Sequence, residues 1–115
     1  MISKELIKGT LRSIVLRLLL EHKRMYGYEI TREVSKLTSG KINLTFAALY
    51  PVLHKLEADG YVLTETENVS NRIRKYYALT GNGKKEAAKK VLEFHHYMET
   101  MGLIFKPGER LKTTK

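Results

Sequence analysis

The spacing of the apolar residues changes at Gly60, and this change limits what the chain can fold into. Before Gly60 the apolar residues recur every three or four positions, which is the repeat of amphipathic helices. After it, residues 61–67 and 72–79 are rich in β-branched and aromatic residues and alternate with a period of two. The polar segment 68–71 predicts the tip of a β-hairpin. Helices followed by one hairpin predict a mainly α protein with a small β-hairpin wing, the layout of a winged helix-turn-helix.

The helix that precedes Gly60 is predicted to have two unlike faces. Thr45 is a suitable N-cap, and Gly60 is a suitable C-terminal stop. The stripe that faces the core consists of Leu49, Val52, Leu53 and Leu56. At about 100° per residue, the opposite face carries Ala47, Tyr50, Pro51 and His54. A face meant only for solvent would usually carry Lys and Glu, so this face favours recognition. Pro51 costs roughly 3 kcal/mol in a helix interior, and its spacing alone does not explain how it is tolerated.

Another helix is predicted before this one. Ile30, Val34 and Leu37 recur at helical spacing, and the helix is expected to end near Ser39–Gly40. The short segment 42–44 that follows is expected to be extended and to pair with a strand.

Both ends of the chain predict helices with more apolar surface than one domain covers. The first runs from Ser3 to about His22 and is apolar around most of its circumference. The last, capped by Thr80, has an a/d repeat that ends before Pro107. This repeat is too short to hold a coiled coil alone, so the two helices predict a homodimer. The expected dimer contacts are Leu6, Leu11, Val91, Phe94, His95, Met98 and Met101.

The charge balance favours a polyanionic partner. Lys and Arg number 21 and Asp and Glu number 12, which gives a formal net charge of +9. Binding to phosphates releases condensed counterions and therefore favours such a chain. A surplus of charge that serves solubility is the alternative.

The sequence predicts three parts of the chain. They are a DNA-binding winged helix with its N-terminal helix (1–80), a dimerisation helix (81–106) and a disordered basic tail (107–115).

Several functional classes are disfavoured by the composition. Cysteine is absent, which excludes disulfides, thiolate zinc sites and cysteine nucleophiles. No apolar run approaches the roughly 18 residues of a membrane span, and no signal peptide is recognisable, so a cytoplasmic protein is expected. His95 and Glu99 are the nearest approach to a metal site, and two ligands do not make one. The prediction is therefore no enzyme, no metal and no cofactor.

Several short motifs, taken together in this order, resemble the PadR family of transcriptional regulators in its short form with one C-terminal helix. They are Tyr-Gly-Tyr-Glu-Ile at 26–30, Ala-Leu-Tyr-Pro at 48–51 with Leu53, Leu56-Glu57 and Gly60, Arg-Ile-Arg-Lys-Tyr-Tyr at 72–77, and Leu79-Thr80 with Gly83. Each motif alone is weak, but the order and spacing are specific. The resemblance extends from residue 6 to about residue 101.

The resemblance implies a winged-helix dimer, usually a repressor, that is joined through its first and last helices and released from DNA by an effector. The Leu-Tyr-Pro at 49–51 matches the family's recognition helix, which accounts for Pro51. The chain departs from the family at Ala47 and Ala48, where glycine or threonine is common. Some short members line an aromatic pocket with a tryptophan, whose place Phe94 takes here. A small-molecule effector pocket is expected at Phe94, His95 and Met98.

The expected contacts with double-stranded DNA divide into positioning and reading. Tyr26 and Tyr28 would give hydroxyls to phosphates, although burial of Tyr28 in the core is an equal alternative. The recognition helix would enter the major groove, and the wing arginines would grip the backbone or the minor groove. Lys75 and Tyr77 are expected to brace the hairpin on its core side. The candidate DNA-binding residues are Tyr26, Tyr28, Asn43, Thr45, Ala47, Tyr50, Pro51, His54, Lys55, Asn71, Arg72, Arg74 and Lys75.

A dimer of this kind predicts a pseudo-palindromic operator. The alternative function is a winged helix that docks an acidic protein and has no DNA specificity. Lys55, Arg72 and Arg74 converge on the predicted recognition surface, which favours DNA.

Overall fold

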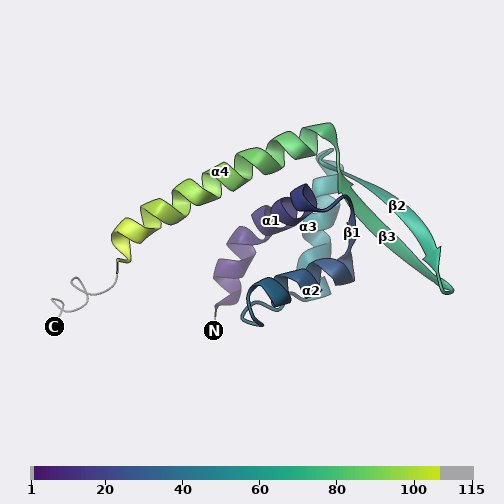
Figure 1. Ribbon diagram of the computed structural model, residues 1–115, viewed down its shortest axis with the longest axis horizontal. Helices are drawn as coiled ribbons and strands as arrows, with labels where there is room; N and C mark the ends of the chain where they lie inside the picture. Colours follow the sequence, from purple (N-terminus) through teal and green to yellow (C-terminus); the bar gives the residue numbers. More distant parts are fainter. Residues whose placement is uncertain (1, 107–115) are drawn as a thin grey trace.

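The computed structural model describes residues 2–106 and has the predicted architecture, mainly α with a hairpin wing. Helices α1, α2 and α3 gather in the middle of the molecule, and the β2–β3 hairpin projects from them (Figure 1). The last helix, α4, starts beside the base of the hairpin, passes α1 and ends far from the sheet (Figure 1). The elements are α1 Lys4–Glu21, β1 Met25–Tyr26, α2 Gly27–Leu37, α3 Phe46–Ala58, β2 Val62–Val69, β3 Arg72–Leu79 and α4 Gly81–Ile104. The tail predicted at 107–115 lies outside the described residues.

Three helices begin at the N-caps that the sequence predicted. Ser3, Thr45 and Thr80 each accept a hydrogen bond at the side-chain hydroxyl from the backbone N–H three residues on, at 3.4, 3.2 and 2.9 Å. Each bond satisfies an N–H that the helix itself leaves without a partner. Gly60, with φ of +81°, follows the end of α3 and turns the chain into β2. The predicted start and stop of the recognition helix are therefore confirmed.

Pro51 lies inside α3 at its sixth residue, where it removes one helical hydrogen bond. The bond lost is the one that would reach the carbonyl of Ala47. Both residues are exposed, so water can reach that carbonyl and the backbone group is not left buried and unpaired. The exposed position of this face explains why the helix tolerates the proline.

The sheet is antiparallel with the strand order β1-β3-β2. In the hairpin, Val62 lies opposite Leu79 and Val69 opposite Arg72. The connecting residues are Ser70 and Asn71, with φ of 51° and 65°. Positive φ at both positions is typical of the two-residue turns that fit the twist of a hairpin. The prediction of a four-residue tip at 68–71 was wrong, because strand pairing continues to Val69.

A two-residue strand, β1, was not predicted. Met25 pairs with Tyr77 and Tyr26 with Tyr76 along the free edge of β3. The segment 42–44, which was expected to pair, forms no strand. Ile42 and Leu44 pack against the hydrophobic core instead. Two residues are also too few to show an alternating pattern, so periodicity does not reveal β1.

The core lies around α1, which packs against α3, α4 and β3. Leu16, Leu49 and Leu53 are fully buried there. Leu11, expected at the dimer interface, is buried in the chain's own core and leaves no surface for a partner, which corrects that assignment. Among the described residues, none of the helices has the length and apolar character of a membrane span.

Helix α4 is most deeply buried in its first two turns, and it passes along α1 beyond them. Gly83 abuts the carbonyl of Tyr61 so closely that a Cβ at this position would collide with it. Gly83 and Ala87 are the buried residues of the helix, whereas Met98 and Phe105 are exposed. The radius of gyration is 16.7 Å, against about 13 Å for a compact domain of this length. Most of α4 therefore extends beyond the core and keeps its apolar surface uncovered.

Candidate nucleic-acid interface

A concave surface forms where the outer face of α3, the start of α2 and the inner edge of the wing meet. It unites residues from three segments that are far apart in the sequence and were predicted to contact DNA. Its lining residues are Tyr26, Gly27, Tyr28, Phe46, Tyr50, His54, Arg72, Ile73, Arg74, Lys75 and Tyr77. The core stripe of α3 points away from it, with Leu49, Leu53 and Leu56 fully buried. The two-faced helix that the sequence predicted is thus present.

The outer face of α3 carries a row of stacked rings. The ring centroids of Phe46 and Tyr50 are 5.6 Å apart, and those of Tyr50 and His54 are 6.2 Å apart. Ala47 and Pro51 lie beside this row and are exposed. Sequence reasoning missed Phe46, although its spacing of four from Tyr50 and eight from His54 was the available signal. Neighbouring rings restrict one another, so the row presents a stiff surface at an exposed site.

Tyr50 lies directly against the start of α2. A Cβ added to Gly27 would meet the Tyr50 hydroxyl oxygen at 3.0 Å and the adjoining ring carbon at 3.4 Å. The absence of a side chain at Gly27 therefore lets the tyrosine ring lie against the α2 backbone. The tyrosine is still 39% exposed, so it remains available to a ligand. Gly27 thus acts by making room for Tyr50.

The two tyrosines at the start of α2 face outward to different degrees. Tyr28 is 51% exposed, so the alternative that it belongs to the core is wrong. Tyr26 is half-buried, and its backbone N–H donates to the Glu29 carboxylate at 3.1 Å. The Arg32 guanidinium lies 5.6 Å from the centre of the Tyr28 ring. Both phenols thus lie at a helix N-terminus, where backbone N–H groups also favour anions.

The wing adds cations to the concave surface. Arg74 is half-buried, with its guanidinium carbon 4.6 Å from the centre of the Tyr26 ring, and Arg72 is exposed. Tyr77 is buried against the core, as expected, and burial raises the pKa of its phenol. Lys75 does not brace the hairpin as predicted: it is exposed, with Nζ 5.7 Å from the Tyr77 ring centre. The hairpin extends beyond the helices at Lys75, so the sheet face that covers Tyr77 in the core is open to solvent at Lys75.

Three predicted contacts have local structural partners instead of lining this surface. Lys55 Nζ lies 3.3 Å from the Asp59 carboxylate, which Arg12 of α1 also contacts at 2.8 Å. The hydrogen bond from Arg12 and then that from Lys55 lower the pKa of Asp59. Asn43 Nδ2 donates to the Gly40 carbonyl at 2.7 Å, and Thr45 caps α3. Asn71, the remaining wing residue, is exposed in the hairpin turn.

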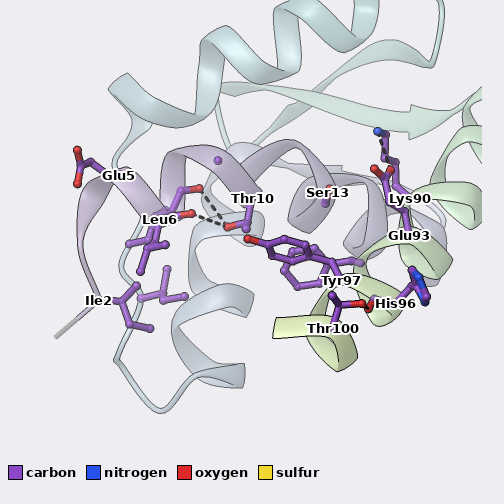
Figure 2. Close-up of a pocket in the computed structure, with 14 residues that line it drawn as sticks. Ile2, Glu5, Leu6, Thr10, Ser13, Lys90, Glu93, His96, Tyr97 and Thr100 are labelled. Carbon is purple, nitrogen blue, oxygen red and sulfur yellow. Dashed lines mark hydrogen bonds and ion pairs between the residues drawn. The ribbon is translucent and has the colours of Figure 1, made fainter. Parts of the chain in front are cut away.

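Five of the seven predicted dimer residues line two hollows along α4. Figure 2 shows the hollow between the start of α1 and α4, where Leu6 and Ile2 lie across from Tyr97 and Thr100. The second is a cavity of about 320 Å³ between α1, α2 and α4, lined in part by Val91, Phe94, His95 and Met98. Met101 is half-buried further along the helix. The predicted effector residues Phe94, His95 and Met98 thus share one cavity.

Within residues 2–106, no three His, Cys, Asp or Glu side chains gather in a way that could hold a metal ion.

A helical core with an exposed recognition helix and a hairpin wing defines the class of the protein: it is a winged-helix DNA-binding regulator.

The particular family follows from comparison with known proteins. Residues 15–89 match the family model described as the transcriptional regulator PadR-like family. An uncharacterized protein X of Lysinibacillus sphaericus is 37% identical over 105 residues, which cover 90% of this chain and 95% of that protein. This chain belongs to the PadR-like family of transcriptional regulators, which confirms the resemblance seen in its motifs, and it is not an enzyme.

Solved structures support the same family. A transcriptional regulator from Clostridium thermocellum superposes with a TM-score of 0.80 at 28% identity, covering 91% of this chain and 99% of that one. A PadR family transcriptional regulator from Eggerthella lenta gives a TM-score of 0.74 at 28% identity, covering 90% and 88%. The arrangement of α4 relative to the winged helix is therefore shared over nearly the whole length of these chains.

The contact between Gly27 and Tyr50 leads to a prediction about DNA preference. Gly27→Ala places a methyl group against the Tyr50 hydroxyl and should displace the ring, lowering the preference for operator over random duplex by about tenfold. In a Tyr50→Phe background no hydroxyl meets the methyl group, so Gly27→Ala should change the preference little. Competition binding of the four proteins measures this coupling.

Gly81→Ala is the matched control, because a Cβ there would meet nothing within 4 Å. An equal loss from Gly27→Ala in both backgrounds would show that Gly27 does not act through Tyr50.

Proposed function

We propose that this regulator reads operator DNA with the outer face of α3 in the major groove and holds the backbone with the wing. The observation that carries the proposal is the concave surface itself, which joins the α3 face, two phenols at a helix N-terminus and the wing arginines. Recognition helices of this class place exposed side chains against base edges while neighbouring elements contact phosphates. A regulator that binds chromosomal DNA would act in the cytoplasm.

The charges on the wing support the backbone contact. Among residues 2–106, the ion pairs include Arg12, Arg17, Arg24, Lys55 and Lys90 but neither wing arginine. Arg72 and Arg74 therefore have no carboxylate partner to give up when they meet a phosphate. The α3 residues that line the concave surface, in contrast, are Phe46, Tyr50 and His54 and include no Lys or Arg, which suits discrimination between bases better than attraction to the backbone.

A salt series separates the two kinds of contact. With the intergenic DNA upstream of the chain's own gene as operator, Tyr50→Ala should lower the preference over random duplex by about tenfold or more. Arg74→Ala should weaken binding to both DNAs and reduce the slope of log K against log salt by about one. Titrations by fluorescence anisotropy at several salt concentrations provide both numbers.

Lys85→Ala is the control, because it removes an exposed cation outside the concave surface. Equal binding of the wild type to operator and random duplex, with no change in either variant, would contradict the proposal and favour a protein-docking role.

We further propose that the chain acts as a homodimer on a pseudo-palindromic operator, with α4 and the start of α1 at the interface. The support is the uncovered apolar surface: Leu6 is 66% exposed and Met98 48%. Exposed large apolar residues that gather along one helix often mark an interaction surface. Two recognition helices related by a twofold axis would then read half-sites about one helical turn apart.

A charge placed at the centre of this surface should separate the protomers. Met98→Glu is expected to raise the dimer dissociation constant about 30-fold or more, because it buries an unpaired carboxylate at the interface. Sedimentation velocity over a range of concentrations measures this change. Leu63→Glu makes the same chemical change at an exposed residue of the wing and should leave the dimer intact. A monomeric wild type would refute the dimer.

We also propose that a small-molecule effector binds in the cavity between α1, α2 and α4. The regulator would then be a repressor that leaves its operator when this ligand binds. Its volume of about 320 Å³ is within the range of ligand pockets. Val34 and Leu37 of α2 line it together with Phe94 of α4. A ligand that moves α4 relative to α2 would change the separation of the two recognition helices in a dimer.

Release of DNA tests this role. A panel of aromatic acids and aromatic amines is titrated into the complex of wild-type protein and operator, and at least one compound is expected to displace the DNA. Leu37→Ala, which changes the α2 side of the cavity, should weaken that response while binding operator normally in the absence of ligand. Displacement by none of the compounds, or an unchanged response in Leu37→Ala, would exclude this cavity as the aromatic effector site.

A further inference from the structure

Arg24, which the sequence analysis did not single out, contacts both carboxylates on the outer face of the wing. It immediately precedes β1, and its Nη1 donates to Glu65 Oε1 at 2.7 Å. Its Nη2 donates to Glu67 Oε2, also at 2.7 Å. One guanidinium thus joins two residues of β2 that are more than forty positions away in the sequence.

The strand pairing holds Arg24 in this place. Tyr76 of β3 lies opposite both Tyr26 and Glu65, so these side chains share one face of the sheet. The Arg24 guanidinium carbon lies 3.8 Å from the centre of the Tyr76 ring, within the range of a cation–π contact. The bonds to Glu67 and Glu65 raise the pKa of Arg24 above its ordinary value. The guanidinium is therefore held by two carboxylates and one ring face.

The consequence for Arg74 is visible in the register of the hairpin. Glu67 lies directly opposite Arg74, and opposite charges in such a pair normally attract each other. Arg74 nevertheless contacts the Tyr26 ring, and it takes part in none of the ion pairs found among residues 2–106. The carboxylate of Glu67, opposite Arg74, is bonded to Arg24.

We propose that Arg24 is a positioning residue for DNA binding, which holds Glu65 and Glu67 so that Arg74 stays available to a DNA phosphate. This inference rests on the wing contact of the proposed function. Without Arg24, two unpaired carboxylates on the strand that pairs with the wing arginines would repel the phosphates, and Glu67 would pair with Arg74. Arg24 acts through these residues and does not itself contact the DNA.

The test uses two full-length variants that both lack the clamp. Arg24→Ala should weaken binding to operator and random duplex about tenfold, the size of one lost charge-assisted hydrogen bond, and reduce the salt slope by about one. The triple variant Arg24→Ala, Glu65→Gln, Glu67→Gln removes the carboxylates as well. It should return the affinity to within about twofold of the wild type and restore the lost unit of the salt slope.

This comparison separates two possible roles of Arg24. In one role it keeps Arg74 available to a DNA phosphate, and in the other it only stabilises the structure of the wing. Both variants lose the contacts of Arg24, so a disordered wing would weaken both. A triple variant as weak as Arg24→Ala overturns the inference. Thermal unfolding followed by circular dichroism identifies any loss that comes from unfolding. Arg17→Ala is the matched control, because it breaks an arginine ion pair with Glu21 on α1, away from the concave surface.

Failure of this inference is distinguishable from failure of the proposed wing contact. If Arg74→Ala weakens binding and Arg24→Ala does not, the wing contact stands and the role of Arg24 is refuted. If Arg74→Ala itself binds like the wild type, the wing contact is refuted and the inference is overturned with it.

Discussion

The pairing of β1 with β3 is the interaction on which the geometry of the concave surface depends. Met25 and Tyr77 lie opposite each other and are both buried. The strand β3 continues into the wing arginines, and β1 continues directly into α2. These two residue pairs thus fix the position of the start of α2 relative to the wing. Because a hairpin alone is marginally stable, this third strand also fastens the wing to the helices.

Charge on the wing is organised by pairing. Arg24 pairs with Glu65 and Glu67, and Arg12 and Lys55 pair with Asp59 at the far end of α3. Exposed ion pairs of this kind add little to stability. Their effect here is to decide which cations keep a carboxylate partner and which do not. A net charge of +9 therefore says less about DNA binding than the few cations that the fold leaves without a partner.

The winged helix with α1 differs from α4 in how far its apolar residues are buried. Helix α1 and the winged helix bury their apolar stripes in one core, and among residues 2–106 no buried side-chain polar atom lacks a hydrogen-bond partner. Helix α4 has fully buried residues only at its start, and residues such as Leu103 and Phe105 remain exposed. A helix of this kind gains stability from packing rather than from intrinsic propensity. Its ordering is therefore expected to depend on a second protomer, which is a physical reason to link dimerisation with control of DNA binding.

Local chemistry determined the helix caps at Ser3, Thr45 and Thr80, the two faces of α3 and the existence of the hairpin, since each depends on residues close in the sequence. The family motifs led to the recognition face in the same way. Long-range packing decided the rest: the pairing of β1, the burial of Leu11, the exposure of Lys75 and the clamp made by Arg24. These features arise from contacts between distant segments. The spacing of residues in the sequence does not indicate which distant carboxylate an arginine will contact.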